Sequence, residues 1–150
     1  MENLKNGSTF DNNWKNILDK LESEIKDEFG ASLPVYRAIS VPKGVSQALQ
    51  LNPVSSNLVE FFSNGETREY SITIHFIYSE ANINETAIDH IMRYVSRFEE
   101  LIKQNKIMTL SDTNSTTVSN CRLEEELLNS DPESGSYIVE WDYKCLHTTV

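Results

Sequence analysis

The fold of this 150-residue chain is decided by the segment Tyr70-Ser71-Ile72-Thr73-Ile74-His75-Phe76-Ile77-Tyr78, in which apolar and polar residues alternate. Successive side chains of a β-strand point to opposite faces of a sheet. The even-numbered positions therefore share one apolar face, whereas Ser71, Thr73 and His75 share the other, with Ile77 as the exception. We expect a strand that buries one face against a core and leaves the other face polar.

Further strands are expected upstream of this segment. Leu58–Ser63 is followed by Asn64-Gly65, a pair of residues that tolerates positive φ and is a strong hairpin signal between two strands. Short strands are also expected at Val35–Ser40 and Ser46–Leu51, with Pro53 ending the second.

The C-terminal part of the chain predicts one clear strand after a polar stretch. Residues 109–120 are rich in Ser, Thr, Asn and Asp, and carry at most a weak strand through Val118 and Cys121. The final strand again alternates, and its apolar face consists of Tyr137, Val139, Trp141, Tyr143 and Cys145.

Two amphipathic helices are predicted, because apolar residues recur at spacings of three and four. The first is capped by Asp11 or Asn12 and ends at Gly30; the second is capped by Asn82 or Asn84. The first apolar stripe is Phe10, Trp14, Ile17, Leu18, Leu21, Ile25 and Phe29. The second is Ala87, Ile88, Ile91, Tyr94, Val95, Phe98, Leu101 and Ile102.

These elements predict the α+β class: one small domain over residues 1–150, in which two helices cover a mainly antiparallel sheet. The polar residues 1–10 are expected to form a flexible N-terminal arm. A chain of this length buries enough surface for a proper core. Helices and strands are too few and too mixed for a doubly wound parallel sheet.

The charge of the chain excludes several classes of function. The sequence has 13 Lys and Arg against 23 Asp and Glu, which gives a net charge of −10. Sequence-independent nucleic-acid binding and docking on an anionic membrane both need a basic surface.

Neither a signal peptide nor a membrane-spanning segment is recognisable. Cys121 and Cys145 are interpreted as reduced thiols in a cytosolic setting.

Half of the net charge lies in residues 107–136, where six carboxylates face only Arg122. Within this region Glu124-Glu125-Glu126 is interpreted as a solvated face, since a Ca²⁺ loop needs oxygen ligands at alternating positions around a glycine turn. Two interpretations of the whole region stay open. It is a soluble loop region, or an electrostatic surface that binds a basic partner or repels nucleic acid.

No constellation of residues predicts catalysis. His75 is interpreted as a half-exposed strand residue, although it has the chemistry of a base or metal ligand. Asp89 and His90 point in different directions on a helix, and His147 stands alone in the sequence. Cys145 lies on the apolar face of its strand, where a thiol is inert. We therefore expect no catalytic residue, no cofactor and no metal ion.

The order of the elements resembles that of the tail terminator and tail-completion proteins at the head–tail junction of long-tailed bacteriophages. The segments that carry the resemblance are Asn13–Leu18, Ser63–Glu66, Thr67–Tyr78, Ile88–Leu101 and Tyr137–Cys145. Together they span most of residues 10–147. The resemblance is one of pattern and element order, without a diagnostic short motif, and the polar stretch 111–136 matches no part of it.

The resemblance implies a curved sheet flanked by two helices and a function based on binding alone. Such proteins form a ring, typically hexameric, that caps the tail tube, stops its polymerisation and joins it to the head connector. The location would be the virion tail or neck, and the host cytoplasm during assembly. DNA would pass through the ring without specific binding. Residues 109–120 and the loop from Pro42 to Pro53 are the expected interface elements.

Three alternatives remain. The chain is another structural subunit of the same particle, from the head-completion, neck or baseplate region. It is a cytosolic adaptor or inhibitor whose acidic charge occupies a basic site. The least favoured alternative is a small hydrolase that uses His75 or Cys145.

Overall fold

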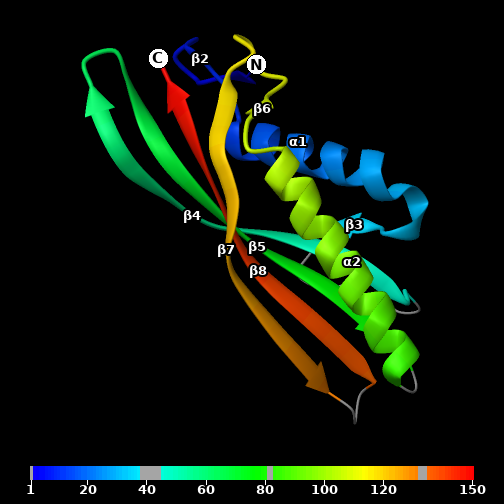
Figure 1. The fold of residues 1–150 in the computed structure, drawn as a ribbon. Helices are drawn as coiled ribbons and strands as arrows, with labels where there is room; N and C mark the ends of the chain where they lie inside the picture. The colour runs from blue at the N-terminus through cyan, green and yellow to red at the C-terminus, as the bar shows by residue number, and fades with distance from the viewer. Residues whose placement is uncertain (1, 38–44, 81–82, 132–134) are drawn as a thin grey trace.

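Two helices cover one face of a six-stranded sheet, which is the expected α+β architecture (Figure 1). The computed structural model describes residues 2–37, 45–80, 83–131 and 135–150. The strands lie in the order β3-β4-β5-β8-β7-β6, and every neighbouring pair is antiparallel except β3 with β4. The sheet is strongly twisted, so the β4–β5 hairpin and the far ends of β7 and β8 point in different directions.

The sheet and the helix layer are built from elements of very unequal length. The helices are α1 (Asn13–Phe29) and α2 (Glu85–Gln104), with a 3₁₀ turn at Gly30–Ser32. A separate hairpin is formed by β1 (Glu2–Asn3) and β2 (Thr9–Phe10). The sheet contains β3 (Val35–Tyr36), β4 (Gln47–Phe62), β5 (Gly65–Ser79), β6 (Met108–Thr109), β7 (Thr117–Asp131) and β8 (Ser136–Thr149).

The centre of the sheet is the pair β5 and β8. Their register runs without a shift from Glu66 opposite Thr149 to Ser79 opposite Ser136. The alternation that the sequence predicts is confirmed on both strands. Its inward positions are almost fully buried, and they are Tyr70, Ile72, Ile74 and Phe76 on β5 and Val139, Trp141, Tyr143 and Cys145 on β8.

Both helices begin at a predicted cap, and α1 ends where Gly30 indicates. The Asn12 side chain accepts a hydrogen bond from the backbone N–H of Lys15, and Asn84 does the same for Ala87. Gly30 ends α1 with a φ of 60°. The predicted stripes supply the helical part of the core except for Phe10, which lies in β2 before the helix and is exposed, so its place in the stripe was wrong. Phe98 of α2 packs against Trp141 of β8 with ring centroids 4.7 Å apart.

One long strand, β4, replaces the two short strands expected at Ser46–Leu51 and Leu58–Ser63, so the expectation that Pro53 ends a strand is wrong. The N–H of Leu49 points away from β5, because it donates to Pro34 O on the other side. Backbone N–H groups alternate along a strand, so position 53 also faces away from β5. A proline there removes no hydrogen bond of the β4–β5 ladder, and β4 continues through a bulge between Pro53 and Ser55.

The hairpin between β4 and β5 is confirmed, but its turn differs from the expected Asn64-Gly65. Phe62 pairs with Gly65, so the two loop residues are Ser63 and Asn64, and neither has positive φ. Gly65 is required for another reason. A Cβ atom at this position would lie 2.0 Å from the backbone oxygen of Thr149 on the neighbouring strand.

The polar stretch 111–136 contains a long strand that the sequence pattern does not reveal. β7 runs from Thr117 to Asp131, where only a weak strand through Val118 and Cys121 was expected. Two register shifts against β8 interrupt the two-residue period of β7. Residues 124–130 are also exposed, so no buried face imposes alternation on them.

Two further expectations concern the start of the chain and β3. Residues 2–10, expected to be a flexible arm, form a hairpin in which Leu4 N–H donates to Ser8 O at 2.7 Å. Flexibility of this segment in solution stays a prediction. The strand expected at Val35–Ser40 is β3 at Val35–Tyr36, and residues 38–40 lie outside the described residues.

We predict that Gly65→Ala destabilises the protein by about 1 to 3 kcal/mol, because the new methyl group has to displace the backbone of Thr149. Urea unfolding measures the change, with Ser63→Ala in the same turn as the control. Deleting residues 149 and 150 removes the clash, so Gly65→Ala should cost clearly less in the shortened chain. An equal cost in both chains would contradict the steric explanation.

Candidate functional site

The open face of the sheet, opposite the helices, carries a network of ion pairs across β5, β7 and β8. Arg122 contacts Glu69 at 3.0 Å and Glu124 at 2.8 Å, and Lys144 contacts Glu124 at 3.2 Å. Arg122 and Lys144 hold the pKa of Glu124 below its usual value. Both cations are therefore engaged by carboxylates of their own sheet.

Carboxylates outnumber cations on this face. Glu125 lies opposite Asp142, and Glu140 lies opposite His75, on the same side as the ion-pair network. We call this surface the acidic face, and define it by Glu69, Arg122, Glu124, Glu125, Glu140, Asp142 and Lys144. The predicted solvated character of Glu124–Glu126 holds for all three glutamates, which are exposed, but they do not share one face, because Glu126 lies opposite Trp141 on the other side of the strand.

The three histidines lie apart from one another. His75 sits on the open face, with Nε2 2.7 Å from Glu140 Oε1 and Nδ1 3.3 Å from Gln50 Oε1. His90, on α2, contacts Gln47 and stacks near Tyr94. Within the described residues, no group of three or more His, Cys, Asp or Glu side chains is suited to a metal ion.

His147 has partners that the sequence did not reveal. It is buried at the end of β8, and its Nε2 lies 2.8 Å from Thr116 Oγ1. The same hydroxyl donates to Asp112, and burial lowers the pKa of His147. The hydroxyl stands between the carboxylate and the imidazole, so the histidine does not connect the acid to a nucleophile as in a catalytic triad. The contacts fix the loop that precedes β7.

The two cysteines are neighbours across β7 and β8, and both are free and buried. A hydrogen bond to Cys121 and burial together raise the pKa of the Cys145 thiol far above its usual value. A protonated, buried thiol is a poor nucleophile. The inert role expected for Cys145 is therefore supported by its surroundings.

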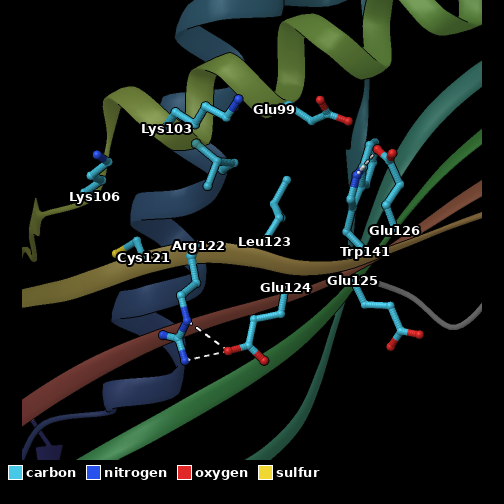
Figure 2. A pocket seen from close by; sticks show the side chains of 11 residues that line it. Glu99, Lys103, Lys106, Cys121, Arg122, Leu123, Glu124, Glu125, Glu126 and Trp141 are labelled. Carbon is cyan, nitrogen blue, oxygen red and sulfur yellow. Dashed lines mark hydrogen bonds and ion pairs between the residues drawn. The ribbon is translucent and has the colours of Figure 1, made fainter.

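A cleft of about 410 Å³ separates α2 from β7 (Figure 2). Glu99 of α2 and Glu126 of β7 lie at one end, where Trp141 Nε1 donates to Glu126 Oε1 at 2.8 Å. Lys103 of α2 and Lys106, which follows the end of this helix, line one wall, and Leu123 points into the middle. Hydrogen bonding to Glu126, together with partial burial, raises the pKa of Glu99 to about 7.

Large apolar side chains are exposed on the two long outer strands. On β4, Phe61 is 75% exposed, and Val54, Leu58 and Val59 are also exposed. On β7 the exposed pair is Leu127 and Leu128. These residues were not predicted to form a surface, although Leu58-Val59 and Leu127-Leu128 break the alternation of a half-buried strand. The segments expected as interfaces, 109–120 and 42–53, stay predictions, and residues 42–44 lie outside the described residues.

None of the helices described is both long enough and apolar enough to cross a membrane.

We predict a pH-dependent effect of Glu99→Gln. The folded protein holds the Glu99 proton more tightly than the unfolded chain does, so stability falls as the pH rises from about 4.5 to about 7. The amide keeps a hydrogen-bond donor and removes the charge. Glu99→Gln should therefore raise the Tm at about pH 8 and have little effect at about pH 4.

Thermal unfolding at both pH values checks this prediction, with the adjacent Glu100→Gln as a matched removal of charge. A Tm difference that is the same at both pH values would show that the carboxyl pair does not share a proton.

Comparisons with known proteins find similarity only in the fold. Neither a protein-family model nor a curated protein sequence matches the chain. Among solved structures, 22 chains match. One of them belongs to a structure described as the virion of a native gene transfer agent (GTA) particle. It aligns with a TM-score of 0.58 and 10% sequence identity, over 90% of this chain and 93% of that chain. At this identity the likeness establishes a shared fold.

Proposed function

We propose that this protein is a structural subunit of a phage-like virion. The observation that carries the proposal is the shared fold with a chain of a gene transfer agent virion, which extends over nearly the whole length of both chains. The described surface agrees with a subunit that acts through contacts. It offers exposed apolar side chains on two strands, and its histidines and thiols are held in structural contacts.

Within the virion, the proposed role is that of a tail terminator. Support comes from the element order, since a helix, a long hairpin, a second helix and a final strand follow one another as the resemblance requires. The protein would form a ring, typically of six copies, on the last ring of the tail tube. Its partners would be the tail tube protein and the head connector. Its place would be the neck of the particle after assembly in the host cytoplasm.

The acidic face is proposed to line the channel of this ring. Free Lys and Arg side chains attract DNA phosphates. When they bind the phosphates, counterions are released from the DNA, and this release favours binding. On the acidic face Arg122 and Lys144 already pair with Glu69 and Glu124. A channel with this lining would let DNA pass without holding it.

The proposed role requires no chemistry. We predict that His75→Asn and Cys145→Ser, singly and together, leave particle formation intact, because both residues have structural partners rather than an exposed reactive group. The measurement is the number of particles that transfer DNA when each variant replaces the wild-type chain. A loss above about tenfold in a variant that still folds would revive the hydrolase alternative.

The location of the chain tests the proposal directly. We predict that, on a density gradient of a particle-producing lysate, antiserum against the chain detects it in the fraction of intact tailed particles, at a few copies per particle. Antibody labelling in electron microscopy then distinguishes the neck from the baseplate or head. Finding the chain only among free soluble proteins would contradict a virion role and favour the inhibitor alternative.

A further inference from the structure

The two outer long strands leave much of their backbone without a partner strand in the described part of the chain. Among the described residues, which leave out 38–44, β3 pairs with β4 at Leu49 and Gln50, and no described strand pairs with the outer side of β4 from position 52 to 62. β6 pairs with β7 only at Thr117 and Val118, and β7 is unpaired on its outer side from position 122 to 131. An exposed edge of this length is a ready template for another strand.

The directions of the strands make the two edges complementary. β4, β5, β8 and β7 are successive antiparallel neighbours, so β4 and β7 run in opposite directions. A second copy placed beside the first in the same orientation would present its β4 antiparallel to β7. We infer that β4 of one copy pairs with β7 of the next, so that successive copies continue one antiparallel sheet.

The side chains favour this pairing over pairing of like edges. Two β7 edges side by side would bring together two runs of three glutamates, Glu124–Glu126, and like charges on adjacent strands are unfavourable. The outer part of β4 carries a single charged residue, Glu60, beside Leu58, Val59 and Phe61. The β7 edge is acidic and the β4 edge is mostly apolar, so pairing of β7 with β4 avoids the charge repulsion of a β7–β7 pair. Leu127 and Leu128 supply apolar area on the β7 side.

The two unpaired edges are also staggered along the sheet. The β4 edge extends from the level of Thr73 towards the hairpin turn, and the β7 edge extends from the level of Lys144 to the opposite end of the sheet. Each added copy must therefore shift along the strand direction. In a closed barrel, such a stagger means that the strands are tilted relative to the barrel axis. The contact joins two different surfaces, which is the type that closes into a ring.

A continuous sheet keeps its faces on the same sides from copy to copy. All helices would then lie on one side of the ring wall and all acidic faces on the other, so that a single face lines the channel in every copy. The inference deepens the proposed ring and rests on it. It names the residues at the junction, which the fold likeness does not.

The register identifies where a substitution blocks an edge without damaging the monomer. N–H groups alternate between the sides of a strand, and the outward direction is fixed by the bond from Leu49 N–H to Pro34 O. Following the register through the bulge between Pro53 and Ser55 places the N–H of Ser56 outward on β4. Carrying the alternation across β5 and β8 places the N–H of Leu128 outward on β7. Proline at either position removes an outward donor only, as Pro53 does in the natural sequence.

We predict that Ser56→Pro and Leu128→Pro each lower the assembled fraction at least about tenfold. The controls are Ser56→Ala and Leu128→Ala, which keep the N–H group. Sedimentation velocity of the full chain measures assembly, and circular dichroism with urea unfolding confirms that each variant folds like its control. Wild-type protein that stays monomeric at about 1 mM would overturn the inference.

Mixing the two proline variants is the decisive step. The Ser56→Pro chain keeps an intact β7 edge, and the Leu128→Pro chain keeps an intact β4 edge. An equimolar mixture should form dimers of one chain of each kind, which native mass spectrometry distinguishes by mass, and no larger rings. If Leu128→Pro alone forms dimers through β4, or if both variants assemble like their controls, the inference is overturned.

These results are independent of the test of the proposed function. Proline variants that assemble normally, in a chain found in the particle fraction, would overturn the edge pairing and leave the virion role standing. Ring formation through the two edges by a chain absent from particles would support the edge pairing and remove the virion role.

Discussion

The pairing of β5 with β8 is the interaction on which the remaining structure depends. These two strands lie side by side over their whole described length without a register shift, from Glu66 opposite Thr149 to Ser79 opposite Ser136. Their inward residues stay in phase, so Ile74 and Trp141 fall on the same buried face. Both helices pack on this face, and Phe98 of α2 contacts Trp141 directly. A shift by one residue would reverse every side chain of a strand and remove the core.

The outer strands follow different rules because they are held on one side only. β4 and β7 each contain two register shifts, and each runs far beyond its short outer neighbour, β3 or β6. Bulges bend a strand and increase its twist, which produces the curled ends of the sheet (Figure 1). The same irregularity leaves Phe61 and Leu128 exposed at opposite ends. The exposed apolar surfaces thus lie on the parts of β4 and β7 that do not pack against the core.

The polar side of the sheet is consistent with a protein that works by assembly. Its cations are neutralised by neighbouring carboxylates, and its histidine is held between Glu140 and Gln50. The cleft beside α2 contains the carboxyl groups of Glu99 and Glu126, whose contact raises the pKa of Glu99 to about 7, and the Trp141 indole donates to Glu126. The ion pairs and the contacts of His75 connect neighbouring strands, whereas the charge of Glu99 opposes folding above about pH 7. The chain shares its fold with a chain of a gene transfer agent virion.

The sequence by itself determined the elements whose signals are local. The caps Asn12, Asn84 and Gly30, the stripes of both helices apart from Phe10, and the alternation of β5 and β8 were predicted and confirmed, because each depends on residues within a few positions of one another. Tertiary structure alone decided the continuation of β4 past Pro53 and the strand β7, since both depend on which side of the backbone is paired. It also decided the contacts of His147 with Thr116 and of Cys121 with Cys145, which join segments more than twenty residues apart. No local pattern records a partner at that distance, because the partner is chosen by the register of the sheet.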